Sequence, residues 1–264
     1  MNVVERAVDN IDPSLSAWLR GAKARWRKDQ IVRLIKESVA PGAVTVDVGA
    51  NRGVYTLLLS ARAGRTGRVH AIEPHPDHAP RLRTLARRHP NITFHPVALS
   101  DQPGEAELRV PIYQGRQIDA LATLNASFDV PYERLIVPVR TLDDVLSHET
   151  GRITFLKCDV EGYEQYVLRG GVKSIRESMP VIVAEIEQRH RADPIQGTFT
   201  YLGELGYVGY FIDAVGCRPL AEFDVTRHQI AAAGAGIVPT SMPKDYVSDF
   251  VFLPRVSAME VSSD

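Results

Sequence analysis

The chain has 264 residues, of which 44% are hydrophobic and 24% are charged, and its formal net charge is −1. This composition is ordinary for a globular protein, and the balanced charge gives no overall basic field for nucleic acid or an anionic membrane. No apolar run approaches the roughly 18 residues of a transmembrane helix, and the first residues lack the apolar core of a signal peptide. Two cysteines are too few for a disulfide framework and fit a reducing compartment. We therefore expect a cytoplasmic protein without a transmembrane segment.

Residues 1–40 are expected to form an N-terminal helical extension. Asp12-Pro13 is a typical helix start, and apolar residues recur at helical spacing from Leu15 to Ile35. Lysines and arginines occupy many of the remaining positions. Such a basic helix can bind an anionic partner or a membrane. We favour the alternative, in which the basic side chains form a solvated face on helices that cover the core.

Strands and helices alternate after residue 41, which favours a parallel sheet with right-handed crossovers. The strands expected in the first half cover residues 44–48, 67–73 and 92–97, and the helices cover 54–62 and 76–88. The strands expected in the second half cover residues 105–110, 135–139, 153–159, 180–186, 207–212 and 248–253. The helices expected there begin at Thr141 and cover 163–177 and 198–205.

The proposed main domain spans residues 41–256, and a disordered tail is expected over 257–264. Two long connections leave from the carboxyl ends of strands, the edge where open α/β sheets bind ligands. Long loops in compact domains are usually functional. We therefore expect cap insertions near residues 101–135 and 213–247, with residues 112–130 as loop.

The strand over residues 44–48 runs into a tight turn that is typical of a nucleotide-like ligand site. A dinucleotide-binding turn needs three glycines in the pattern G-x-G-x-x-G. Counting from Gly49, the second and third of these positions hold Asn51 and Val54. The pattern is instead D-x-G-x-x-x-G, with Asp47 where a pyrophosphate would be repelled.

The expected second strand ends in Glu73, 20 residues after Gly53, at a spacing suited to the hydroxyls of a ribose. S-adenosylmethionine has a ribose and a cationic amine but no phosphate. The turn and Glu73 together therefore favour S-adenosylmethionine over a dinucleotide. The alternatives are that Asp47 caps the strand end and that Glu73 is a surface charge.

Four segments of the sequence resemble the FkbM-type methyltransferases. They are Val46–Thr56, Ile72–Pro76, Val97–Asp101 and the K-x-D-x-E-G segment Leu156–Glu164. The resemblance extends over about residues 40–212, with looser matches at Glu164–Gly170 and Gly206-Tyr207. It implies an α/β, Rossmann-like class I methyltransferase fold, a seven-stranded, mostly parallel sheet with an antiparallel last strand. It also implies S-adenosylmethionine as cofactor and transfer of the methyl group to an oxygen.

The resemblance assigns roles to the cofactor-binding positions. Gly49, Asn51 and Gly53 would shape the cofactor loop, and Asp47 would lie near the methionine end. The remaining positions carried over are Tyr55 and Thr56 beside Asp47, Glu73 with Pro74 at the ribose, and Ser100 or Asp101 at the adenine.

The acids expected at one mouth of the sheet, together with His190, are Asp159, Glu161, Glu185 and Glu187, because the strands over 153–159 and 180–186 end at the same edge. Asp159 and Glu161 fall where the family has its acidic block, so they are expected at the methyl-transfer centre, with Asp159 also near the cofactor. Glu185 and His190 complete the candidate catalytic set. A histidine is a suitable base by its ordinary pKa, although a surface role for His190 is equally consistent with its charged surroundings.

The acceptor is expected to be a hydroxyl of a sugar, polysaccharide, glycolipid or related secondary metabolite. The same acids could hold Mg²⁺, but no ligand spacing is diagnostic and no metal ligands are assigned. Nucleic acid is disfavoured, because Asp159-Val160-Glu161-Gly162 stands where base-modifying N-methyltransferases usually carry an N-P-P-Y-like block. A homodimer is left open. The competing interpretations are a non-catalytic S-adenosylmethionine-binding module and a nicotinamide-dependent oxidoreductase.

Overall fold

The computed structural model describes residues 25–113, 115–118, 121–124, 131–149, 151–231 and 246–255. The expected helix start at Asp12 and the expected tail over 257–264 lie outside these residues. The first described element is α3 (Arg25–Ser38), which belongs to the expected helical extension.

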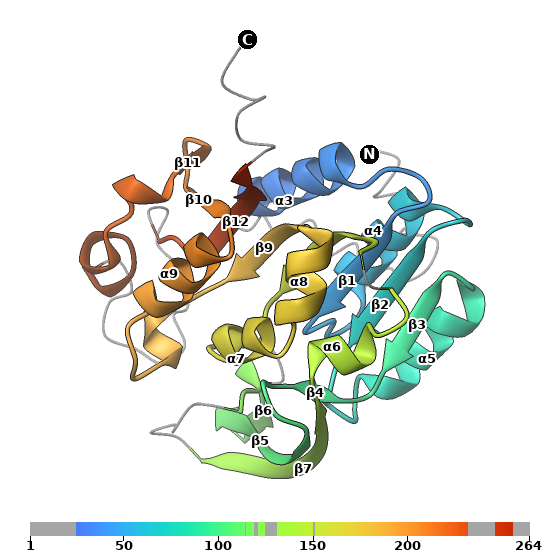
Figure 1. Ribbon diagram of the computed structural model, residues 1–264. Coiled ribbons are helices and arrows are strands. Elements are labelled where there is room, and N and C mark those ends of the chain that lie inside the picture. Colours follow the sequence, from blue (N-terminus) through green and yellow to red (C-terminus); the bar gives the residue numbers. More distant parts are fainter. Residues whose placement is uncertain are drawn as a thin grey trace.

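An eight-stranded sheet forms the centre of the fold, in the order β11-β10-β12-β9-β8-β1-β2-β3 (Figure 1). Its strands are β1 (Val44–Val48), β2 (Arg68–Ile72), β3 (Ile92–His95), β8 (Ile153–Cys158), β9 (Val181–Glu185), β10 (Tyr207–Ile212), β11 (Cys217–Pro219) and β12 (Asp249–Pro254). The block from β3 to β9 is parallel. All five residues of β1 are buried, as expected for a parallel strand that is covered on both faces.

The last strand, β12, lies between β9 and β10 and is antiparallel to both, with Val251 opposite Val183 and Tyr210. This order and direction confirm the expected class I methyltransferase fold. The structure adds an eighth, short strand, because the chain turns after Ile212 and β11 pairs with the edge of β10.

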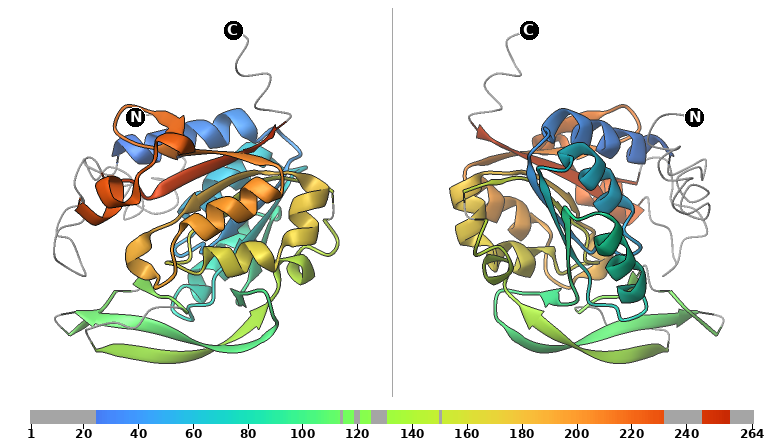
Figure 2. Two further views of the ribbon diagram at one scale, coloured as in Figure 1. Left: turned by 60° about the vertical axis from the view of Figure 1, so that its left-hand side comes forward. Right: turned by 90° about the vertical axis from the view of Figure 1, so that its right-hand side faces the viewer.

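Helices cover both faces of the sheet (Figure 2). On one face α3, α4 (Val54–Ala63) and α5 (Ala79–Arg88) pack through leucines and isoleucines against alternate residues of the strands. On the other face lie α6 (Leu142–Val145), α7 (Glu164–Arg169), α8 (Val172–Ser178) and α9 (Gln196–Glu204). The expected helix over 163–177 is two helices, since it is interrupted at Gly170-Gly171.

The close approach of Leu142 and Ser100 to these glycines explains the interruption. A Cβ at Gly170 would lie 2.1 Å from the carbonyl oxygen of Ser100, and one at Gly171 would lie 2.5 Å from Leu142. The break between α7 and α8 thus lets α6 pack against the helix layer.

A second sheet projects beyond the carboxyl ends of the central strands (Figures 1 and 2). Its order is β4-β7-β5-β6, and its long members β5 (Gly104–Tyr113) and β7 (Tyr132–Arg140) form an antiparallel ribbon. The short strands are β4 (Ala98–Leu99) and β6 (Arg116–Gln117). The expected short strands 105–110 and 135–139 are thus the middle of a longer hairpin, which we call the ribbon. Part of the expected 112–130 loop is strand.

The connection after β10 contains β11 and two short helical turns, Leu220–Glu222 and Thr226–Ile230. Within the described part of the chain, no helix has the length and apolar character needed to cross a membrane.

Candidate active site

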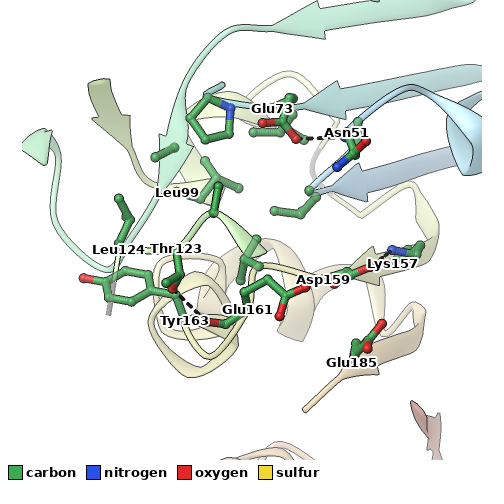
Figure 3. A pocket seen from close by; sticks show the side chains of 18 of the residues that line it. Asn51, Glu73, Leu99, Thr123, Leu124, Lys157, Asp159, Glu161, Tyr163 and Glu185 are labelled. Atoms are coloured by element: carbon green, nitrogen blue, oxygen red, sulfur yellow. Dashed lines mark hydrogen bonds and ion pairs between the residues drawn. The ribbon is translucent and has the colours of Figure 1, made fainter. Parts of the chain in front are cut away.

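A cavity of about 480 Å³ opens where β1, β2, β8 and β9 end, and its opposite wall is lined by Val97–Leu99, Leu108 and Ala122–Leu124 (Figure 3). Glu73 and Asn51 lie at one end of it, and Asp159, Glu161 and Glu185 gather at the other. The described lining residues are Val48–Arg52, Val54, Tyr55, Ile72–Pro74, Val97–Leu99, Leu108, Ala122–Leu124, Lys157, Asp159–Glu161, Tyr163 and Glu185.

The turn after β1 passes very close to the end of β8. Gly49 has a φ of 76°, and a Cβ on it would lie 1.8 Å from the carbonyl oxygen of Asp159. Only glycine fits such an approach and adopts this backbone conformation without strain. The amides of Gly49 and Ala50 both donate to the carbonyl oxygen of Ile72. The turn therefore holds the ends of β1, β2 and β8 together at the cavity.

Glu73 is buried at the end of β2 and is fixed by two backbone donors. The amide of Asn51 donates to its Oε2 and the amide of His75 donates to its Oε1, each at 2.8 Å. Burial nevertheless raises the pKa of Glu73 to about 7. Each carboxylate oxygen keeps a further lone pair that can accept from a ligand hydroxyl.

A buried charge network lies beneath the cavity floor. The Nζ of Lys157 is 2.9 Å from Oδ2 of Asp159 and sits over the ring of Tyr55. Burial opposes the ammonium form of Lys157, but Asp159 and Asp47 raise its pKa, so the lysine stays charged. Thr56 donates to Oδ2 of Asp47 at 2.6 Å, while Oδ1 has no hydrogen-bond partner among the described residues.

Three carboxylates, those of Asp159, Glu161 and Glu185, line the acidic end of the cavity. Burial and the neighbouring carboxylates raise the pKa values of Glu161 and Glu185 well above the ordinary value. Glu161 has a left-handed backbone with φ 53°. The buried Glu164 supports this loop, because its Oε1 accepts from the amides of Gly162 and Val160.

Behind Glu161 lies a second set of buried polar side chains. The Nε2 of His190 is 3.1 Å from Oε2 of Glu161 and 3.6 Å from Oε2 of Glu187. Tyr246 donates to Glu187 at 2.6 Å, and Arg189 pairs with the same carboxylate. Burial opposes the ionised form of Glu187, but His190 and Arg189 lower its pKa to about 2. Glu187 is therefore a permanent negative charge next to His190.

The ribbon side of the cavity is mostly apolar and touches the acidic loop directly. Leu108, Ala122 and Leu124 line the cavity there, together with Leu99 of β4. Thr123 donates its hydroxyl hydrogen to the carbonyl oxygen of Glu161 at 2.7 Å.

The structure brings most of the expected site residues to one cavity. Its lining includes the expected cofactor residues Gly49, Asn51, Tyr55, Glu73, Pro74 and Asp159, and the expected catalytic residues Glu161 and Glu185. Asp47, Thr56 and His190 are buried behind the walls. Gly53, Ser100 and Asp101 are not among the lining residues, so the adenine contact of Ser100 or Asp101 stays a prediction.

Sequence reasoning gave no role to Lys157, Tyr163 or Thr123, and it placed Glu187 at the mouth of the sheet without adding it to the catalytic set. Lys157 lies inside the K-x-D-x-E-G segment, and a charged residue in a buried strand was the signal that could have found it. Tyr163 lies in the same segment, and its hydroxyl is 3.3 Å from Oγ of Ser100. Thr123 had no local signal, because a distant part of the chain gives it its role.

Metal ligands do not assemble in the part of the chain that the structure describes, where no group of three or more histidines, cysteines or acids is placed to hold a metal ion.

S-adenosylmethionine fits the residues of the cavity. Glu73 has free acceptor capacity for ribose hydroxyls, and Val97, Leu99 and Leu108 offer an apolar surface for a flat base. Asp47 and Lys157 supply charges of both signs near the turn, as an amino-acid moiety requires. A dinucleotide would place its negatively charged pyrophosphate at this turn. The buried carboxylate of Asp47 at the same turn would repel it.

The sheet order, the antiparallel last strand and a cavity with an acid at the end of β2 define the class of S-adenosylmethionine-dependent methyltransferases of the class I fold. The chain belongs to the methyltransferase FkbM domain family, whose model matches residues 47–208.

The individual relatives that match this chain have low sequence identity to it. The hexuronic acid methyltransferase AglP of Haloferax volcanii is 28% identical over 162 residues, which cover 60% of this chain and 62% of AglP. The crystal structure of methyltransferase FkbM from Methylobacillus flagellatus is 20% identical, with a TM-score of 0.47 over 84% of this chain and 50% of that one. Aeropyrum pernix fibrillarin with natively bound S-adenosyl-L-methionine is 12% identical, with a TM-score of 0.45 over 84% of this chain and 73% of that one.

Proposed function

We propose that this protein is an S-adenosylmethionine-dependent O-methyltransferase that methylates a hydroxyl of a sugar, polysaccharide, glycolipid or related secondary metabolite. The observation that carries the proposal is the division of one cavity into two ends. Glu73 occupies the end suited to a ribose, and Asp159, Glu161 and Glu185 occupy the end suited to a polyhydroxylated acceptor. The similarity to a hexuronic acid methyltransferase supports a sugar as the acceptor class.

The donor supplies an already activated methyl group, so the protein must bind, orient and exclude water. Glu73 would hold the ribose, and Lys157 would face the amino-acid moiety with the carboxylate of Asp47 behind the wall. The ribbon covers the cavity with apolar side chains, which limits water at the reacting oxygen. Holding two reactants in line can contribute roughly 7–11 kcal/mol of the barrier.

The acceptor hydroxyl needs a base, because a neutral hydroxyl is a weak nucleophile. Glu161 lines the cavity and can take the proton on a carboxylate oxygen, with His190 at 3.1 Å to receive it. The ionised Glu187 would stabilise the charged imidazole that results. Glu161 is thus the group that touches the acceptor, and His190 acts through it.

Transfer of a labelled methyl group tests the proposal. The protein is incubated with methyl-labelled donor and a panel of glycosides, oligosaccharides and glycolipids, and the product linkage is determined by mass spectrometry. An O-methyl ether on a sugar hydroxyl is the expected product. Labelling of nitrogen alone, or of no acceptor in the panel, would contradict this function and return a donor-binding module to first place.

Calorimetry distinguishes the proposed methyltransferase from a nicotinamide-dependent oxidoreductase. S-adenosylhomocysteine should bind at micromolar or lower concentration, while NAD should not compete with it. Tight binding of NAD without binding of S-adenosylhomocysteine would overturn the proposed function altogether.

A further inference from the structure

The acidic end of the cavity carries more carboxylates than cations. Asp159, Glu161 and Glu185 line it, and Asp249 lies opposite Glu185 in the register of β9 and β12. Glu187 is buried just behind.

The cations near this end are already engaged. Among the described residues that line the cavity, the positively charged side chains are Arg52 and Lys157. Lys157 pairs with Asp159, and Arg189, outside the lining, pairs with Glu187. Arg52 follows Asn51 in the turn after β1, and Asn51 lies at the opposite end of the cavity from Glu185 (Figure 3).

Glu161 and Glu185 therefore face the cavity without a lysine or arginine partner in the described structure. The ion-pair partner of Glu161 among the described residues is His190, and Glu185 accepts no hydrogen bond and forms no ion pair with another described side chain. Burial, and after it the charges of Asp159, Asp249, Glu187 and Glu161, raise the pKa of Glu185 well above its ordinary value. A ligand that supplies positive charge would satisfy both side chains, whereas a ligand carboxylate would add to the repulsion.

We propose that the acceptor presents a protonated amine to Glu161 and Glu185 beside the hydroxyl that is methylated, so that the acceptor class is an amino sugar rather than a uronic acid. This inference rests on the proposed function, because it assigns the acceptor of the same cavity. It also separates this chain from its relative AglP, whose name specifies a hexuronic acid.

Three methyl glycosides that share the same sugar ring but differ in charge test the inference. The complex with S-adenosylhomocysteine is titrated with the methyl glycosides of glucosamine, glucose and glucuronic acid at neutral pH, where the amine is still largely protonated and ionisation of the two carboxyl groups beside it is favoured by its charge. The amino sugar should bind at least about tenfold more tightly than the glucoside, as expected for a hydrogen bond between charged groups. The uronate should bind most weakly.

A variant that removes one carboxylate tests which groups cause the preference for the amino sugar. Glu185→Gln keeps the shape of the side chain and removes its charge, so the advantage of the amino sugar over the glucoside should shrink to within about threefold. Glu105→Gln removes the same charge from an exposed position on the ribbon and should leave the order unchanged. If Glu185→Gln does not fold, Glu161→Gln provides the same comparison.

Equal affinities for the three probes, including binding of none, would overturn the inference, as would a uronate that binds as tightly as the amino sugar. The transfer assay with the same probes keeps the two proposals apart. Methyl ether formation on the uronate alone would refute the charge preference and leave the O-methyltransferase. A preserved preference with label only on nitrogen would refute the O-methyltransferase and leave the charge preference.

Discussion

Thr123 and Glu161 are 38 residues apart in the sequence, yet the threonine hydroxyl donates to the glutamate carbonyl oxygen at 2.7 Å. Thr123 belongs to the connection between β5 and β7, and Glu161 to the loop after β8. Since Glu161 has a left-handed backbone, its peptide orientation depends on contacts such as this one. The hydrogen bond therefore joins the wall that covers the cavity to the loop that carries the proposed base.

Thr123→Val should loosen this loop while it keeps the size of the side chain. We expect turnover to fall roughly tenfold, because a displacement of about 1 Å at a reacting centre is costly, while affinity for S-adenosylhomocysteine changes little. Stability should fall by about 1 kcal/mol. The control is Thr84→Val, which removes a similar bond to the carbonyl oxygen of Pro80 on the exposed side of α5. Equal kinetic effects of the two variants would refute the role given to Thr123.

Glu73→Ala should weaken the binding of S-adenosylhomocysteine by roughly ten- to a hundredfold, because hydrogen bonds to a charged group are lost. The same change frees the amides of Asn51 and His75. Calorimetry measures the affinity, and thermal unfolding shows whether the turn is still formed. Asp77→Ala, an exposed acid in the same loop, should leave binding unchanged. Unchanged affinity in Glu73→Ala would remove Glu73 from the site.

Asp159→Asn should reduce turnover roughly a hundredfold and change donor affinity by no more than about threefold. The asparagine keeps the shape but leaves Lys157 without its partner charge at 2.9 Å. Single-turnover kinetics and calorimetry together give the two quantities, with the exposed Asp193→Asn as control. If turnover and donor affinity fell by the same factor, Asp159 would instead be a residue that binds the cofactor or supports the structure.

Glu164 should make the protein less stable as the pH rises from about 4.5 to 7. Burial raises its folded-state pKa to about 7 from an ordinary value of 4.5, so in this range the folded chain holds a proton that the unfolded chain has released. Rising pH then lowers the free energy of unfolding. Glu73 acts in the same direction.

Glu164→Gln should flatten that dependence, because an amide stays neutral and its oxygen can still accept from Gly162. Melting temperatures between pH 5 and 8 check this, with Glu105→Gln expected to follow the unmodified protein. Parallel curves for Glu164→Gln and the unmodified protein would show that Glu164 does not titrate in this range.

The elements that follow from local sequence patterns could be predicted from the sequence alone. The strands and helices from Val44 to His95 follow from apolar periodicity and from glycine and proline at the turns. The acids at strand ends, Glu73 and Asp159, were recognisable because parallel neighbours bring their carboxyl ends to one edge of the sheet.

The parts that escaped prediction depend on long-range contacts. The full length of β5 and β7 is set by pairing between the two strands, such as that of Pro111 with Tyr132. The sequence between residues 112 and 130 gives no local signal for this pairing. The burial of Glu187 results from contacts with Tyr246, which lies 59 residues further along the chain. In the same way, the charged run around His190 is typical of a surface, but the fold buries this histidine against Glu161 and Gly162 of the loop after β8.

The ribbon leaves and rejoins the domain at adjacent points, because Ala98 and Leu99 of β4 pair with Val139 and Arg140 at the end of β7. An excursion of the chain with neighbouring ends can change in length and sequence without moving the framework that anchors it. The ribbon can therefore change without moving Glu73, Asp159, Glu161 and Glu185, which the central sheet and its loops carry. Grafting of residues 104–138 between family members is accordingly a direct way to reshape the apolar wall of the cavity while its carboxylates stay in place.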